Sequence, residues 1–561
     1  MATPDFLVEV GTEELPPKAL KTLSESFGEG LRSALADAGI EYGEIETFAT
    51  PRRLAVRVNK LADAQPDTPF EKKGPAVKAA FDDQGNPTRA LEGFARNLGI
   101  QPDELDTMET DKGAWLVYRG VEKGRPTAEL LPGMVEQALN GLPIPKRMRW
   151  GSRREEFVRP VHWLIMLYGS KEVPCTVLGC EAEQATRGHR FHHPGELIIS
   201  TPADYELVLR QHGWVEPDFA TRRETIRSGV NRVAEEQAKG SAVINPDLLD
   251  EVTALCEWPV PLLGRFEERF LDVPPEALVS SMEEHQKYFH VVDANNTMMP
   301  CFITVANIAS HDPSAVIAGN EKVIRPRLAD AAFFYDTDRK TPLIDRLDDL
   351  KPIVFQQDLG SLHDKTLRIA SLAGRIAEGI GADPDKARRA GTLSKTDLLT
   401  EMVQEFDDLQ GVMGEYYARH DGEDESVARA LSEQYLPGFA GDRVPQTDIG
   451  ACVALADRLD SLVGLFGINQ PPSGTRDPYA LRRAALGVIR ILVERELTLD
   501  LEELAGWAAG EFNSLTVNDP IQPVVDYILE RFRASFEDQG VPAEVFLAVQ
   551  ARRPTQPLDF H

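Results

Sequence analysis

The chain has 561 residues, with 61 Lys and Arg against 90 Asp and Glu, a formal net charge of −29 and 42% hydrophobic residues. This length and apolar content suit about three to five domains with buried cores and exclude a mainly disordered chain. The sequence contains no apolar run near the ~18 residues of a membrane helix and no signal-peptide pattern at its N-terminus. We therefore expect a soluble, cytoplasmic protein with no membrane partner.

Strand patterns mixed with helices are expected over the first 330 residues. Residues 53–62 alternate, with Leu54, Val56 and Val58 on one face and Arg53 and Arg57 on the other, which predicts a half-buried strand. Further strands are expected at 5–10, 114–119, 161–168, 259–263 and 301–306, and helices at 16–39 and 88–98. This mixture predicts an α+β fold for the N-terminal half.

Helical spacing dominates from about residue 340. Apolar residues recur at i, i+3 and i+4, which is typical of amphipathic helices. The expected helices are 364–381, 386–406, 447–467 and 477–497. The chain is therefore predicted to be multidomain, with an all-α region after the α+β half.

Residues for catalysis or metal binding are hard to find in the sequence. It contains no P-loop, GxSxG, HExxH or EF-hand motif. Its five cysteines are odd in number and form no CxxC pair, so we expect buried thiols without disulfides or zinc. Accordingly, we predict no catalytic residue, no metal site and no cofactor bound by this chain.

Basic clusters are the most informative feature, because they stand out in an acidic chain. Trp150 and Phe191 are interleaved with two of them, as expected for phosphate contact combined with base stacking. Arg52 and Arg53 form a further basic pair. The candidate RNA-binding residues are Lys146, Arg147, Arg149, Arg153, Arg154, Arg187, Arg190, Lys322, Arg325 and Arg327. The alternative is an ordinary solvated surface.

Three histidines follow Arg187, at 189, 192 and 193. The H-x-x-H-H spacing has no neighbouring carboxylate or cysteine, and adjacent histidines point apart in a strand. A polar surface or an RNA contact is thus favoured over a metal site.

Nine sequence blocks, taken together, resemble the β subunit of the bacterial two-chain glycyl-tRNA synthetases. They occur in the family's order and span most of the chain. The blocks are FLVEVGTEELPPKAL (6–20), ATPRRLAVRV (49–58), PKRMRWG (145–151), FVRPVHWL (157–164), TRGHRFHHPG (186–195), MEEHQKYF (282–289), GNEKVIRPRLADAAFFYDTD (319–338), LLTEMVQEFDDLQGVMGEYYA (398–418) and DPYALRRAALGVIRI (477–491).

The resemblance implies a cytoplasmic α2β2 ligase that joins glycine to tRNA(Gly). In this family the α subunit carries the catalytic core and uses ATP with Mg, while the β subunit binds and orients the tRNA. DNA is not an implied partner. No class I or class II catalytic signature stands in its proper context here, which agrees with that division of roles.

The helical half is similar to the HD superfamily of metal phosphohydrolases. In the matching pattern Lys365 and Thr396 occupy histidine positions, while Asp397 and Asp457 keep the carboxylates. Loss of both imidazoles, with an ammonium group added, predicts a degenerate site without metal. His363-Asp364 is out of phase with the HD position.

Four segments follow from these resemblances. They are an N-terminal α+β domain at 1–150 in the tRNA-binding region, an editing-domain-like but non-editing α+β domain at 151–335, an all-α degenerate HD-like domain at 336–515, and a helical linker at 516–561. Family members continue into an anticodon-binding domain that we expect this chain to lack. Two alternatives stay open, an HD phosphohydrolase and an RNA-free scaffold for the α subunit.

Overall fold

The computed structural model describes residues 3–560 except 83–84, 111–112, 475, 514, 516–518, 539, 541 and 553. The chain divides into two compact units, which we describe separately. The first comprises residues 1–264, 287–295 and 302–318, and the second comprises 265–286, 296–301 and 319–561. Among the described residues, no helix is both long and apolar enough to span a bilayer.

A seven-stranded sheet organises the first unit. Its main path runs β2-β3-β1-β7-β10-β9, and β8 pairs with β7 outside this path. All the pairings are antiparallel except that of β10 with β7. The strands are β1 (Phe6–Thr12), β2 (Ile45–Thr50), β3 (Arg53–Val58), β7 (Val161–Tyr168), β8 (Lys171–Glu172), β9 (Thr176–Val177) and β10 (Cys180–Glu183). The strands expected at 5–10, 53–62 and 161–168 are confirmed.

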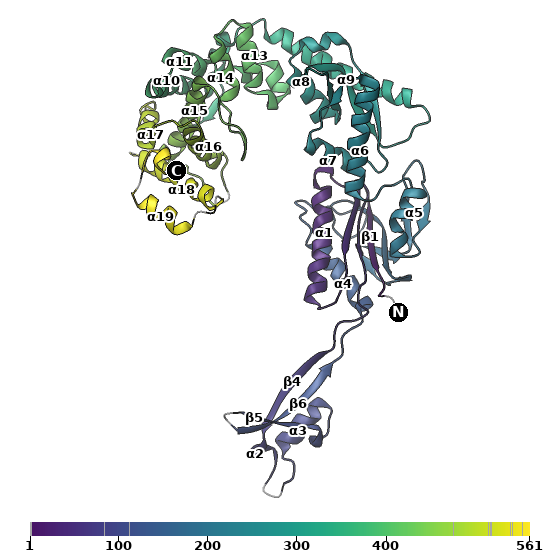
Figure 1. The fold of residues 1–561 in the computed structure, drawn as a ribbon. Coiled ribbons are helices and arrows are strands. Elements are labelled where there is room, and N and C mark those ends of the chain that lie inside the picture. Colours follow the sequence, from purple (N-terminus) through teal and green to yellow (C-terminus); the bar gives the residue numbers. More distant parts are fainter. Residues whose placement is uncertain are drawn as a thin grey trace. The chain divides into compact units, whose positions relative to one another are not determined.

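Both faces of this sheet are covered. Helices α1 (Pro17–Asp37) and α4 (Thr127–Asn140) lie against one face (Figure 1). On this face Phe27 packs with Val8 and Val56. On the other face Leu7 and Ala55 pack with α5 (Tyr205–Gln211). The prediction that 53–62 is half-buried is therefore wrong, because every residue of β3 is buried.

A small three-stranded sheet has a core of its own, formed by Ala80, Leu91 and Leu116. Its order is β4-β6-β5. Its elements are β4 (Thr68–Ala76), α2 (Val77–Ala80), α3 (Arg89–Leu98), β5 (Asp106–Thr110) and β6 (Gly113–Glu122). The helix expected at 88–98 ends, as predicted, at Gly99, whose φ of 71° is left-handed and favours glycine.

A third sheet follows in the order β13-β15-β16-β14. Strands β14 and β16 confirm the expectations at 259–263 and 301–306. The remaining elements around it are β11 (Ala185–Arg187), β12 (Glu196–Ile198), α6 (Phe219–Val233), β13 (Ser241–Ala242), α7 (Pro246–Leu255), β14 (Val260–Arg265), β15 (Phe289–Val292) and β16 (Met298–Ala306). Strands β11 and β12 pair and bracket residues 188–195.

Most of the described residues of the second unit are helical. Strands β17 (Val354–Gln356) and β18 (Gly360–Ser361) pair there as a short antiparallel ribbon. The helices are α8 (Pro275–Ser280), α9 (Pro313–Asp338), α10 (Leu362–Ile380), α11 (Pro384–Leu393), α12 (Glu401–Glu405), α13 (Val412–His420), α14 (Glu425–Glu433), α15 (Asp448–Gly467), α16 (Leu481–Glu494), α17 (Leu501–Ala509), α18 (Ile521–Asp538), α19 (Ala543–Arg552) and α20 (Pro557–Phe560). From residue 340 onward, the described elements are helical apart from this ribbon.

One expected helix, 386–406, is broken. It divides into α11, a 3-10 turn at Thr396–Leu399, and α12. Thr400 caps α12 by accepting the Val403 N–H, and the distant Asp338 accepts the N–H groups of Glu401 and Met402. Capping by side chains thus restarts the helix where apolar spacing alone predicted continuity.

Candidate functional site

A short loop displays the basic residues 146–154 in the first unit. Met148 and Phe157 exchange two backbone hydrogen bonds, of 2.8 and 3.1 Å, and so close the loop at its base. Phe157 is fully buried in the main core, against which Trp150 also packs. The loop is therefore anchored by its apolar residues, while Lys146, Arg153 and Arg154 are exposed.

Carbonyl groups hold two of these arginines in place. Arg147 donates to Asn140 O at 2.9 Å, and Arg153 donates to Gly179 O at 2.7 Å. Within the described residues, Arg149, bound to Glu156 at 2.6 Å, is the member of the loop that forms an ion pair. Arg147, Arg149 and Arg154 line a pocket of about 670 Å³, and Glu136, Glu155 and Glu156 also line it. Because carbonyls fix a guanidinium without neutralising it, the loop keeps a local positive charge.

Arg187 and Arg190 stand at the end of β11 and in the loop that follows. Arg187 lies over the Trp163 ring, 5.3 Å from its centroid. Arg190 is paired with Glu13 and Glu14, each at 3.1 Å. Both arginines are exposed.

Arg52 and Arg53, in contrast, are 8% and 0% exposed. Arg53 contacts Glu257 at 3.1 Å and Glu9 at 3.5 Å, and Arg52 contacts Glu257 at 3.2 Å. Burial disfavours the charge of Arg53, but the two carboxylates hold the pKa of its guanidinium above the usual value. The expectation that this pair adds to a basic surface is wrong, because both side chains are buried and bind Glu257.

His189 is a buried structural residue, 1% exposed. Its Nε2 donates to Asn307 O at 2.7 Å, while its Nδ1 accepts the N–H groups of Phe191 and His192, each at 3.2 Å. This arrangement fits a neutral ring protonated at Nε2. His192 stacks on Trp214 with centroids 4.6 Å apart. A polar-surface role is thus wrong for His189, and the described residues contain no metal-binding cluster.

The third basic cluster is on α9 and belongs to the second unit. Arg325 pairs with Glu267 at 2.7 Å and Arg327 with Glu405 at 3.3 Å. Lys322 is exposed. The two arginines are therefore partly neutralised, which makes this cluster weaker than the 146–154 loop.

Two of the four HD-pattern residues meet inside the helical region. Lys365 Nζ on α10 lies 2.8 Å from Asp457 Oδ1 on α15, and Lys395 Nζ lies 2.7 Å from Asp457 Oδ2. Burial would raise the pKa of the Asp457 carboxyl, but the two lysines hold it far below its usual value. Ammonium groups thus lie against the carboxylate on which a metal would depend.

The other two HD-pattern residues, Thr396 and Asp397, form hydrogen bonds to backbone groups. The Thr396 hydroxyl donates to Leu393 O at 2.8 Å, and the Asp397 carboxylate accepts the Gly411 N–H at 2.5 Å. Burial raises the pKa of Asp397 to about 6. The out-of-phase Asp364 completes a capping box with Ser361 at the start of α10.

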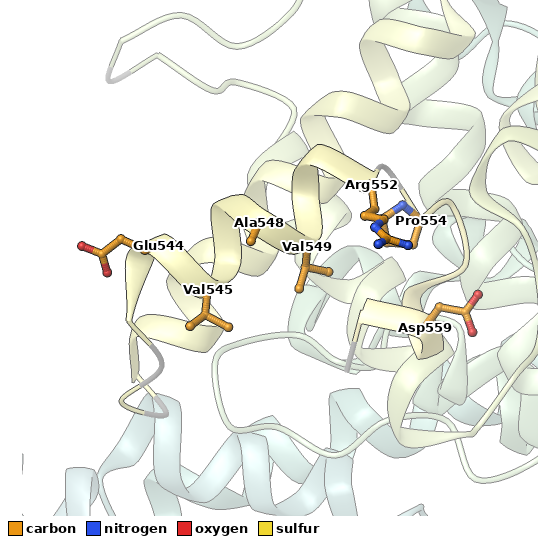
Figure 2. Close-up of a pocket in the computed structure, with 7 residues that line it drawn as sticks. All are labelled: Glu544, Val545, Ala548, Val549, Arg552, Pro554 and Asp559. Atoms are coloured by element: carbon orange, nitrogen blue, oxygen red, sulfur yellow. The ribbon is translucent and has the colours of Figure 1, made fainter.

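The largely apolar pocket near the end of the chain offers little chemistry. It has a volume of about 580 Å³. Figure 2 shows Val545, Ala548 and Val549 along α19, with Arg552 close to its end. All five cysteines are free. Cys256, Cys301 and Cys452 are buried, as expected, whereas Cys175 and Cys180 are half-buried.

A small polar pocket near Arg187 was missed by reasoning from composition and motifs. Its wall includes Thr12, Glu13, His162 and Trp163. These residues lie within the blocks 6–20 and 157–164, whose resemblance to a family was the signal that could have identified them. No local pattern indicated that strands so far apart in sequence would share a cavity.

Comparison with known proteins gives a consistent result over the whole chain. The family model described as "Glycyl-tRNA synthetase beta subunit" matches residues 6–551. The glycine–tRNA ligase beta subunits of Marinobacter nauticus and Hahella chejuensis are 67% and 58% identical over 560 and 556 residues. That of Chromohalobacter salexigens is 56% identical over 561 residues. These matches cover 99–100% of the chain and 80–81% of the relatives' length.

Proposed function

Because the chain belongs to the glycyl-tRNA synthetase beta subunit family, we propose that it binds and positions tRNA(Gly) as the β subunit of a cytoplasmic glycine–tRNA ligase. The α subunit of an α2β2 assembly would activate glycine with ATP and Mg and carry the catalytic residues. Holding the tRNA 3′ end at that site would raise the rate by proximity.

The charge state of the 146–154 loop supports this role most directly. Four of its five cations, Lys146, Arg147, Arg153 and Arg154, form no ion pair with another described residue. Unpaired cations beside an aromatic ring are what a strand of phosphates and bases requires. Because salt screens exposed charges beyond about 8–10 Å, such a loop can contact phosphates although the chain as a whole is acidic.

A salt titration of tRNA binding tests the proposal. Lys146, Arg153 and Arg154 are replaced together by Gln. The matched control replaces Arg32, Arg227 and Lys351 by Gln, because each of these exposed cations has a carboxylate partner three positions away on its own helix or turn. Each phosphate contact contributes about −0.7 to −0.9 to the log–log slope, so the loop variant should lose about two units of slope and the control none. Equal slopes in the two variants would favour a scaffold without RNA contact.

We further propose that residues 336–515 form a degenerate HD-type domain that holds no metal, with 516–561 as a linker. A domain boundary at residue 150 is not part of the proposal, because β1 and β7 pair in one sheet across it. The meeting of Lys365 with Asp457, 92 positions apart, supports an HD-type arrangement. With two ammonium groups on that carboxylate, phosphohydrolase activity is not part of the proposal.

A further inference from the structure

Three strands of the first unit end around a pocket of about 230 Å³. Its wall includes Thr12 from β1, Trp163 from β7, Arg187 from β11, and Arg52, Arg190 and His162 beside them. Pockets for drug-sized ligands measure about 300–1,000 Å³, so this one suits a single small group.

The Thr12 hydroxyl is the first sign that the pocket is built to bind a ligand. The pairing of β1 with β7 shifts register between Gly11 and Thr12, at a β-bulge. The Thr12 N–H still donates to Arg52 O at 2.8 Å, but its Oγ1 has no hydrogen-bond partner within the described part of the chain. Thr12 is 1% exposed, and a buried hydroxyl left unpaired is uncommon in folded proteins.

Positive charge is the second sign. Arg52 is held by Gly188 O at 2.9 Å and by Glu257 at 3.2 Å. The carboxylate in the wall, Glu13, is already bound to His162 at 2.9 Å and to Arg190 at 3.1 Å. Arg187 contacts the Trp163 ring and has no carboxylate partner among the described residues. Its charge is therefore available to an anion.

The wall is also rigid. A Cβ atom at Gly11 would lie 1.8 Å from Trp163 Cε2, so the indole lies directly on the strand backbone. Trp163 Nε1 donates to the buried Glu9 at 2.5 Å, which fixes the ring plane. A Cβ atom at Gly188 would lie 2.7 Å from His193 O. The cavity therefore needs no large rearrangement to accept a small ligand.

We propose that this pocket binds one phosphate group of a nucleic-acid strand, with Arg187 and Arg52 as cationic donors and the Thr12 hydroxyl as a neutral donor. The inference rests on the proposed function for the source of the phosphate. A cavity that combines arginines with a hydroxyl matches the several acceptor oxygens of a phosphate.

The test uses the full chain and two variants, Thr12→Val, which keeps the β-branched shape, and Arg187→Gln. Thr107→Val, at an exposed strand position, is the matched control. Loss of one hydrogen bond to a charged group should weaken tRNA binding about tenfold or more in Thr12→Val. Its salt slope should not change, because no charge is removed. Arg187→Gln should weaken binding and also lower the slope by about one.

Binding of inorganic phosphate, followed by ³¹P NMR with acetate as competitor, identifies the anion. Phosphate binding that Arg187→Gln abolishes and equimolar acetate leaves unchanged supports the inference, whereas equal competition by acetate overturns the phosphate assignment. Parent-like tRNA affinity in both variants overturns the pocket as a site. If the 146–154 variant still lowers the salt slope in that case, the proposed function stands without this pocket. Near-UV circular dichroism checks folding of Thr12→Val, and the exposed Arg187 gives a second reading if that variant unfolds.

Discussion

Replacing Asp457 by Asn should destabilise the helical region strongly. Its carboxylate contacts Lys365 at 2.8 Å and Lys395 at 2.7 Å, and the two lysine side chains are only 5% and 6% exposed. The amide keeps the shape but removes the charge that both ammonium groups face. Lys365 retains Asp460 at 3.0 Å, whereas the hydrogen bonds that Lys395 keeps within the described part of the chain go to neutral groups, Gln434 and Tyr435.

Removing one partner of a buried ion pair lowers the free energy of unfolding by about 3–5 kcal/mol. We place Asp457→Asn in that range because Lys395 is left buried without an ion-pair partner among the described residues. A variant with Lys365→Met, Lys395→Met and Asp457→Leu removes all three charges together. It should recover most of the loss, since apolar replacement of buried ion pairs is commonly neutral or stabilising.

Native-state hydrogen exchange of the amides in α10 and α15 measures the local opening free energy without assuming that the whole chain unfolds in one step. The reasoning is refuted if Asp457→Asn opens within about 1 kcal/mol of the parent. It is also refuted if Mn²⁺ protects the parent protein, because the lysines should exclude a metal. The Asp457 pKa is lower in the folded state, so its contribution should be full at neutral pH and decline as the pH falls below about 4.

Two further predictions concern other parts of the chain. Burial raises the pKa of Asp397 to about 6, so the folded state holds a proton that the unfolded state releases near pH 4. The free energy of unfolding should therefore fall by roughly 3 kcal/mol as the pH rises from 4 to 6. In urea titrations, Asp397→Asn should flatten this dependence on pH. A slope that persists in the variant would assign the effect to another group. Gly11→Ala should destabilise the first unit by more than about 3 kcal/mol, because the added Cβ would overlap the Trp163 ring. The control, Gly93→Ala in helix α3, places its Cβ where no atom lies within 4 Å and should stabilise by up to about 1 kcal/mol. Thermal unfolding compares the two variants, and similar effects would contradict the packing around Trp163.

Local patterns were sufficient to predict most elements of the fold. The apolar run of β1 and the capping glycine at Gly99 mark their elements in the sequence itself. The predictions that were wrong concern residues whose environment is set by side chains far away in the sequence. Arg53 alternates like an exposed strand residue, but Glu257, 204 positions away, converts it into a buried ion pair. The break before α12 likewise depends on Asp338.

In the candidate site, too, local patterns predicted some features, while others depend on the tertiary structure. Charge clustering identified the loop at 146–154, where the arginines are indeed exposed or half-exposed. It could not separate Arg187, which has no carboxylate contact among the described residues, from Arg190, which has two. The unpaired Thr12 hydroxyl is invisible in sequence, because it arises from a register shift between two strands that are about 150 residues apart.

In the proposed division of roles, this chain positions tRNA(Gly) and the α subunit activates glycine. The direct measurement mixes it with a cognate α subunit and follows glycine-dependent ATP–pyrophosphate exchange and glycylation of tRNA separately. We expect the Lys146, Arg153 and Arg154 variant to leave exchange unchanged while glycylation falls and its KM for tRNA rises. Equal loss of both reactions, or parent-like glycylation, would show that the 146–154 loop does not position tRNA.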